Sequence, residues 1–466
     1  MKPTAIIAGI SAFTFTSMAF AADVTVDITG ATAFRTATLT AIKAKYVASG
    51  AAFKFAHDQA TSGGTVYTGA TRAIFIGTFP GVTGTTTIRC CFSGSVEGIR
   101  ALTLGTPDPA ITYYQSSLLD ATTAVIGGAE LPAQGTTGAA HADSEIAFSD
   151  VSKASTPYSS YTLQPASPAC GVVVFTMLTN EGSTITNVTS QQWRALMSGG
   201  FQVKSMFTGN AADNGNFVFA TGRNDGSGTR TTYLAETGYG VASLVNQYVT
   251  VASSSTELKA IQLVPAGGVT ADADPGTAGV QLSADMLAFN SANPTTQIVQ
   301  SSGNKSIVWG QDVDGNGGYS SGSTLRTDMG KTGASVTVFD PTGADSFGGP
   351  VPVELVTFLS IGDAANARGN GAVFCAFNGV KLDGIAASGS SLTVADKAKV
   401  AEGAYTAWGF QQMYQRNAIT PAQTLTDTTA VYNGIKGAIP ANLGSAGMTL
   451  AEMHVGRPAD GGTVAP

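Results

Sequence analysis

The sequence predicts an α/β protein with largely parallel sheets. Short apolar runs alternate with segments of helical periodicity along the whole chain, and 43% of the 466 residues are hydrophobic, which is enough to build cores. The chain length allows about three domains of ~150 residues or two larger lobes. Only 12% of the residues are charged, and Thr, Ser, Gly and Asn supply the polarity instead, a composition common in exported proteins.

The N-terminus has the pattern of a signal peptide. Lys2 precedes an apolar run over 5–20, and Ala19-Phe20-Ala21 fits a small-x-small cleavage site. We therefore expect residues 1–21 to be removed and the mature protein to be periplasmic or secreted. No cysteine lies at the cleavage point, which argues against a lipid anchor, and no later stretch approaches the ~18 apolar residues of a membrane span.

The first third of the chain reads as three strands that end in small or hydroxyl-bearing residues. A strand over 24–29 is followed by Gly30 and by a helix beginning at Thr32, with Leu39, Ile42 and Tyr46 on one face. Two β-like runs, 73–76 and 87–92, lead into a small-residue turn and a helix over 95–102. A further short strand over 145–148 ends in Ser149-Asp150.

The middle of the chain continues this alternation. A buried strand is expected over 171–175, and a capping-box pattern starts a helix at Thr189. Another strand, 216–220, runs into the glycine-rich segment 222–229 and then a helix that stops at Gly238.

The last third is less regular. The segment 300–350 is glycine-rich and expected to form loops, and 353–359 has helical spacing. A buried strand is expected over 372–377, and a helix over 400–414 precedes a polar tail.

Net charge excludes several classes of function. With 24 basic and 31 acidic residues the formal charge is −7, so no general attraction to nucleic acid is expected. The three histidines are scattered, which argues against a metal site, a cofactor and a Ser-His-Asp enzyme. Any anion must therefore be bound by local hydrogen-bond donors.

Three turns have the composition of an oxyanion site. They are Thr32-Ala33-Phe34, Gly94-Ser95 and Gly226-Ser227-Gly228-Thr229, and each stands at a predicted strand-to-helix junction. Helix N-termini supply free backbone N–H groups, and the adjacent hydroxyls add donors.

Three charged residues complete the predicted site. Arg223 can contribute a planar donor fork, which an ion pair with Asp225 can orient. Asp150 accepts hydrogen bonds only when it is ionised, so it would favour a protonated oxyanion such as hydrogen phosphate over sulfate. Alone, Asp150 would more often be a helix cap than a ligand.

These motifs resemble the phosphate-binding proteins of phosphate ABC transporters. Arg223-Asn224-Asp225-Gly226-Ser227-Gly228-Thr229 is similar to their R-x-D-G-S-G-T signature. The segment 28–34 resembles their first anion loop, 94–99 their second, and 148–150 the strand end that carries their selective aspartate. The four elements occur in the family's order.

The resemblance implies a type II periplasmic-binding fold, with two lobes closing over an anion in the cleft between them. The first lobe would comprise 23–165 plus 378–466 and the second 170–372. The protein would be a monomer that binds phosphate or a related oxyanion and delivers it to an ABC permease. The implied ligand-binding residues are Thr32, Phe34, Ser95, Asp150, Arg223, Ser227, Gly228 and Thr229, with Asp225 behind them.

The chain also departs from the family pattern. Arg35 stands where the family commonly has proline, and we expect it to be a solvated first-turn side chain, although an arginine near the site could accept a larger or more highly charged anion. The distance from Phe34 to Ser95 is longer than usual by about thirty residues, an estimate from the family's spacing. A secreted or envelope structural protein that keeps the fold without transport is the alternative function.

The four cysteines, Cys90, Cys91, Cys170 and Cys375, are too few for a disulfide scaffold. Cys170 and Cys375 lie at or within the two runs assigned to the crossings between lobes, which should be neighbours. Either a disulfide joins them or both are buried free thiols.

Overall fold

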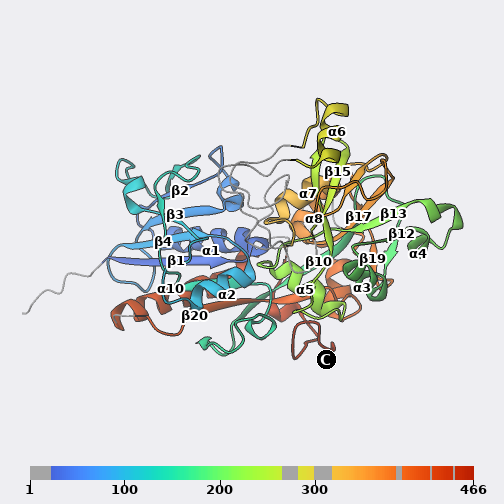
Figure 1. The fold of residues 1–466 in the computed structure, drawn as a ribbon. Coiled ribbons are helices and arrows are strands. Elements are labelled where there is room, and N and C mark those ends of the chain that lie inside the picture. The colour runs from blue at the N-terminus through green and yellow to red at the C-terminus, as the bar shows by residue number, and fades with distance from the viewer. Residues whose placement is uncertain (1–22, 265–281, 299–316, 385–390, 420–421, 444–446) are drawn as a thin grey trace, which may run out of the picture.

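The computed structural model describes residues 23–264, 282–298, 317–384, 391–419, 422–443 and 447–466. The signal peptide expected over 1–21 lies outside these residues. Helices and strands alternate along the described chain, which confirms the α/β class (Figure 1). Within this part of the chain, none of the helices combines the length and hydropathy that crossing a membrane requires.

One large mixed sheet runs through the molecule. Its main path is β12-β13-β17-β10-β20-β8-β1-β4-β3-β2-β6. The strands on this path are β1 (Val24–Gly30), β2 (Lys54–His57), β3 (Arg72–Gly77), β4 (Thr86–Cys91), β6 (Ala129–Leu131), β8 (Ile146–Ser149), β10 (Ala169–Thr179), β12 (Phe201–Val203), β13 (Phe217–Ala220), β17 (Val353–Ser360) and β20 (Trp408–Arg416). The expectation of largely parallel sheets is wrong: β1 runs parallel to β4 and β8, but β10 is antiparallel to both β17 and β20.

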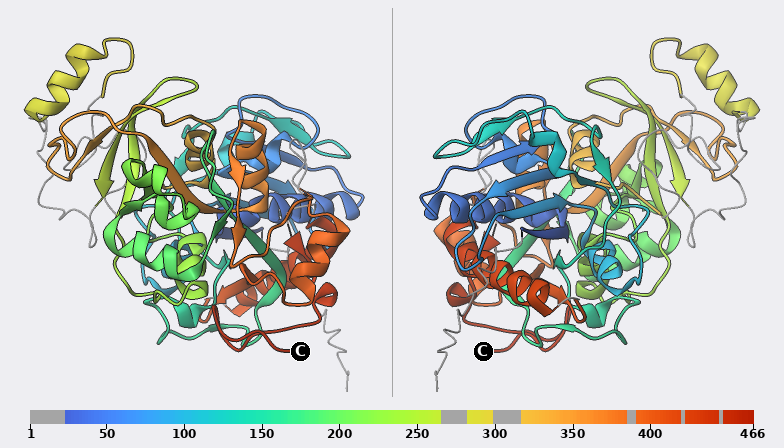
Figure 2. Two further views of the ribbon diagram at one scale, coloured as in Figure 1. Left: turned by 90° about the vertical axis from the view of Figure 1, so that its right-hand side faces the viewer. Right: turned by 90° about the vertical axis from the view of Figure 1, so that its left-hand side faces the viewer.

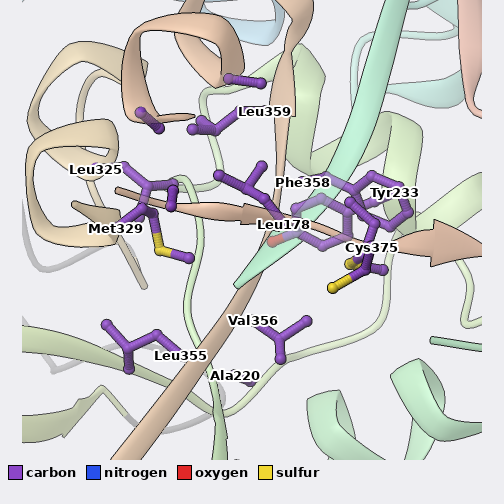
Figure 3. Close-up of a cluster of buried hydrophobic side chains, with 14 of the residues drawn as sticks. Leu178, Ala220, Tyr233, Leu325, Met329, Leu355, Val356, Phe358, Leu359 and Cys375 are labelled. Carbon is purple, nitrogen blue, oxygen red and sulfur yellow. The ribbon is translucent and has the colours of Figure 1, made fainter. Parts of the chain in front are cut away.

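Two large hydrophobic cores divide the structure into what we call the first and second lobes. The first core gathers Ile28, Phe34, Ile42, Phe148 and Val431 among others. Its helices are α1 (Arg35–Ala48) and α10 (Ala422–Asn442), with α2 (Ser95–Thr103) on a smaller cluster beside β8. The second core is larger and includes the cluster of Figure 3. Its helices include α3 (Ser190–Gly199), α5 (Gly228–Glu236), α7 (Gly322–Met329) and α8 (Ile361–Gly369).

Strand β10 joins the two lobes. Its first half, Ala169 to Val174, pairs with β20, and its second half, Phe175 to Thr179, pairs with β17. The lobe boundaries 23–165 with 378–466 and 170–372 stay a prediction. The side chains of Leu392, Val400 and Tyr405 pack in the second core. This packing favours a boundary at which the chain re-enters the first lobe near β20, after residue 378.

Most of the early elements form as predicted because their local signals agree with their packing. Leu39, Ile42 and Tyr46 are fully buried on the inner face of α1. The capping box at the start of α3 is present, with the Thr189 side chain accepting from the Gln192 backbone N–H and the Gln192 side chain accepting in return.

Two predictions in the last third are wrong. The run 353–359 is the strand β17, which lies between β13 and β10 and is buried on both faces, so its apolar residues do not alternate. The helix expected over 400–414 is instead α9 (Val394–Ala401) followed by β20. The helix ends because Gly403 adopts a positive φ of 78°, a conformation typical of a helix end.

The extra residues before Ser95 extend the sheet of the first lobe through β2 and β3. The second lobe also carries a small separate sheet, β14 (Gln247–Ser253), β15 (Leu258–Val264) and β16 (Thr337–Phe339), with α6 (Ala284–Ala292) at the molecular edge (Figure 2). The segment expected to form loops over 300–350 therefore contains α7 and β16, although 299–316 lies outside the described residues.

The proposed disulfide between Cys170 and Cys375 is absent, and all four cysteines are buried free thiols. Cys375 donates its backbone N–H to Met177, seven positions after Cys170 along the extended strand β10. At ~3.3 Å per residue the two sites are about 23 Å apart, whereas a disulfide needs Cα atoms within ~7 Å. Cys375 lies beside Leu178 and Phe358 in the second core (Figure 3).

The C-terminal segment contacts both lobes. The buried Arg457 guanidinium forms an ion pair with Glu236 of α5 at 2.8 Å, and it lies 4.0 Å from the ring centroid of Trp408. Three residues further on, the Asp460 carboxylate accepts a hydrogen bond from the Ser152 backbone N–H, just after β8, at 2.8 Å. The tail therefore links α5 of the second lobe to the first lobe.

Candidate functional site

The predicted anion loops come from four strand ends. Because β1, β4 and β8 are parallel neighbours in the first lobe, the loops after them lie at one edge of the sheet. A short 3-10 helix (Thr32–Phe34) follows β1, α2 follows β4, and Asp150 follows β8. In the second lobe, the segment 221–227 connects β13 to α5 and brings Arg223 toward the same edge.

Gly228 packs closely against the first lobe at this site. A Cβ added there would lie 2.3 Å from Ser95 Oγ and 2.9 Å from Asp150 Cβ. A larger residue at this position would therefore force these atoms or the Gly228 backbone to shift. The glycine of the predicted heptad therefore permits direct contact between the loops of the two lobes.

Asp150 is buried beside Ser95. Its backbone N–H donates to Ser95 Oγ at 3.1 Å, and the residue is only 2% exposed. The Asp150 Oδ1 atom has no hydrogen-bond partner among the described residues. Burial raises the pKa of the Asp150 carboxyl to about 6, partly opposed by a hydrogen bond from Ser95 and the charge of Arg223. An acceptor oxygen without a donor is thus held inside the site.

No carboxylate among the described residues forms an ion pair with the Arg223 guanidinium. Nε donates to the Tyr319 carbonyl at 2.9 Å, Nη2 to the Ser320 carbonyl at 2.6 Å, and Nη1 to Thr32 Oγ1 at 3.4 Å. Asp225 is not among these partners, so backbone carbonyls orient the guanidinium where an ion pair was expected. Burial lowers the pKa of Arg223 to about 10, with Asp363 and Asp150 opposing the shift.

The helices that begin at the predicted loops lack side-chain caps. The 3-10 helix at Thr32, α2 and α5 have none, whereas α3, α6, α7 and α9 are each capped by the serine or threonine that precedes them. Uncapped first turns leave backbone N–H groups for other acceptors. At α2 that acceptor is a protein group: Val96 and Glu97 donate to the Gly226 carbonyl of the second lobe at 3.1 and 3.4 Å.

The remaining predicted residues surround this contact. Ser227 and Thr229 are buried on either side of Gly228. The Phe34 ring instead packs in the first core near Phe148, with 6.1 Å between ring centroids, and the Phe34 backbone N–H donates to Ala31 at 3.3 Å. Direct contacts join Thr32 to Arg223, and Ser95 to Asp150 and Gly228. Their roles as ligands stay a prediction.

Sequence reasoning missed the other side of the site. A cavity of about 1010 Å³ opens beside these loops and is lined by Thr32, Asn224 and Gly226 together with Arg35, Arg100 and Arg230. Arg35, expected to be a solvated first-turn side chain, is instead partly buried and lines this cavity, and burial lowers the pKa of its guanidinium. The position of Arg35 in the first turn after Thr32 was the sequence feature that could have identified it as a site residue. The Tyr319 and Ser320 carbonyls have no such sequence feature, because any residue type can supply a backbone carbonyl.

No family model and no curated protein matches this chain. Among solved structures it is similar to an ABC-type phosphate transport receptor from Vibrio cholerae, with 12% identity and a TM-score of 0.40 over 91% of this chain and 99% of that chain. A putative phosphate ABC transporter substrate-binding protein with bound phosphate from Clostridium perfringens has 10% identity and a TM-score of 0.37 over 91% and 99% of the two chains. PstS from Borrelia burgdorferi has 11% identity and a TM-score of 0.33 over 91% and 98%. At these TM-scores the likeness is one of overall chain course, and the function must be argued from the residues.

Proposed function

We propose that this protein is an exported, monomeric solute-binding protein that captures phosphate or a similar tetrahedral oxyanion between its lobes, for uptake by an ABC transporter. The observations that support this proposal most strongly are the contacts between the lobes, Arg223 with Thr32 and Gly228 with Ser95 and Asp150, together with the buried, unpaired Asp150 Oδ1. The proposal assigns no catalytic role to any of these residues.

Each group has a distinct role in the proposed binding. Arg223 supplies positive charge in a buried setting where its attraction for an anion is only weakly screened. The hydroxyls of Thr32, Ser95, Ser227 and Thr229 and the first-turn amides of α5 donate hydrogen bonds. Ionised Asp150 accepts the O–H of hydrogen phosphate, which sulfate lacks, and hinge movement about β10 and β20 closes the lobes.

Isothermal titration of the phosphate-free protein with phosphate, and with sulfate as the control, tests the proposal. We expect phosphate-selective binding and a loss of this selectivity in Asp150→Asn, because the amide can donate to sulfate. Absence of heat and of thermal stabilisation with either anion would contradict the proposed function.

One observation favours the alternative of an envelope structural protein that retains the fold. The first-turn amides of α2 donate to the Gly226 carbonyl across the lobes, so these donors serve a contact between the lobes. In that case the lobes should stay closed when phosphate is removed. Small-angle scattering with and without phosphate separates the two functions, since a transport receptor should expand on phosphate removal.

A further inference from the structure

The cavity beside the oxyanion loops is much larger than a tetrahedral oxyanion. Its volume is about 1010 Å³. A five-atom anion occupies on the order of 100 Å³, judged from the ~30 Å³ share of one water molecule in the liquid. Cavities of several hundred Å³ are typical of sites for organic ligands. Orthophosphate alone would leave most of this space to solvent.

The cavity adjoins the proposed oxyanion site at Thr32. Thr32, which contacts Arg223, lines it from the first lobe, and Asn224 and Gly226 of the signature heptad line it from the second. A group attached to a phosphoryl oxygen bound next to Thr32 would therefore point toward this cavity.

Arg35 brings positive charge to the part of the cavity nearest Thr32. Arg35 lies one helical turn after Thr32, and no hydrogen bond or ion pair joins its guanidinium to another described residue. Its electrostatic neighbours are Asp363 and Asp58, with Arg326 as a like charge. Arg35 also acts as a like charge on Arg223. A partly buried arginine without a direct partner favours an incoming anionic group.

Other lining residues suit a small polar carbon skeleton. Arg100 is paired with Glu97 and Asp108, so it adds little net charge. The hydroxyl groups and the apolar surfaces of the cavity are supplied by Ser93, Ser155, Ser321, Tyr158, Leu234 and Leu244.

We propose that the preferred ligand is a phosphomonoester with a second anionic group. Its phosphoryl group binds in the oxyanion site in the monoprotonated form, whose one O–H donates to Asp150, and its second anionic group is held by Arg35. This inference rests on the proposed function, because the phosphoryl group occupies the same oxyanion site. It deepens that function from capture of inorganic phosphate to capture of a small phosphorylated organic acid.

A series of three probes tests the inference by isothermal titration: orthophosphate, glycerol 3-phosphate and 3-phosphoglycerate, the last of which adds a carboxylate. We expect 3-phosphoglycerate to bind at least tenfold more tightly than orthophosphate, with glycerol 3-phosphate between them. Arg35→Met should reduce the affinity for 3-phosphoglycerate more than tenfold and that for orthophosphate by a much smaller factor. Lys45→Met, at the other end of α1, is the matched control and should change neither.

The outcomes separate the two proposals. If orthophosphate binds as tightly as both esters, or if Arg35→Met weakens all three probes equally, the further inference is overturned and the oxyanion site stands. If none of the probes binds, the proposed function fails and the inference fails with it. If 3-phosphoglycerate binds more tightly than orthophosphate to the wild-type protein but not to Arg35→Met, the result supports both the proposed function and the further inference.

Discussion

Asp150 destabilises the ligand-free protein when it is ionised, because its carboxylate is buried and Oδ1 lacks a donor. Its pKa of about 6 lies above the ordinary value of 3.8. The folded state therefore binds the proton more tightly than the unfolded state, and stability is lost as the pH rises from about 4 to about 6. The difference of roughly two pKa units corresponds to about 3 kcal/mol.

Asp150→Asn should consequently raise the unfolding free energy of the phosphate-free protein by about 2–3 kcal/mol at pH 7.5 and have almost no effect at pH 4. Urea denaturation of both proteins at the two pH values measures this. Other buried carboxyls, such as Glu145, titrate in both proteins and cancel in the comparison. Equal stabilities at pH 7.5 would show that the carboxylate is solvated.

Selectivity should depend on pH through the same carboxyl. Below about pH 6 the protonated Asp150 can donate a hydrogen bond, so fully deprotonated sulfate becomes acceptable. We expect the preference for phosphate over sulfate to fall at least tenfold between pH 8 and pH 5, measured by titration calorimetry. Asp150→Asn should show a small preference at both pH values, and a parallel pH dependence in this variant would contradict the role of Asp150.

Between elements, Gly228 controls how closely α5 approaches α2 and the Asp150 loop. Gly228→Ala would place a methyl group 2.3 Å from Ser95 Oγ, which forces the lobes apart. We expect the affinity for phosphate to fall at least tenfold while the secondary structure is retained. The control is Gly105→Ala, because a Cβ at this exposed position meets no atom within 4 Å. If Gly228→Ala binds phosphate as the control does, the loops do not close on the ligand.

The sequence was most informative where one local signal agreed with the packing. Strand β1, the helix after Thr32 and the capping box at Thr189 are examples, since each is specified by neighbouring residues. It failed at β17 because a strand buried on both faces has the same apolar run as a buried helix. The disulfide considered between Cys170 and Cys375 was wrong because the sequence does not show which residues of β10 lie beside each neighbouring strand.

Within the candidate site, the residues with distinctive side chains could be predicted and the backbone groups could not. Arg223, Asp150 and Gly228 belong to recognisable motifs, and the structure brings them together with Thr32 and Ser95. The carbonyls that hold Arg223 or cap α2 depend on the folded arrangement alone. The cavity likewise results from loops of both lobes and has no local sequence signal.

At the scale of the whole molecule, the C-terminal segment fastens α5 to the first lobe. Arg457→Met would leave Glu236 buried without its counter-charge, and we expect the unfolding free energy to fall by roughly 3 kcal/mol. The double variant Arg457→Met/Glu236→Leu should recover most of this loss, because no charge then remains unpaired. Urea denaturation at pH 7.5 measures both, and a double variant no more stable than the single one would show that the ion pair is not the cause.

The position of β20 in the sheet also determines the order in which the protein can fold. This strand lies between β8 and β10, so the first lobe cannot complete its sheet until the chain beyond Trp408 is available. A nascent or partly exported chain that ends earlier exposes the edges of two apolar strands, a surface that favours aggregation. Assembly of the first lobe is therefore postponed until nearly the whole polypeptide is present. Under the export that we propose, this delay would keep the chain unfolded during passage through a secretion channel.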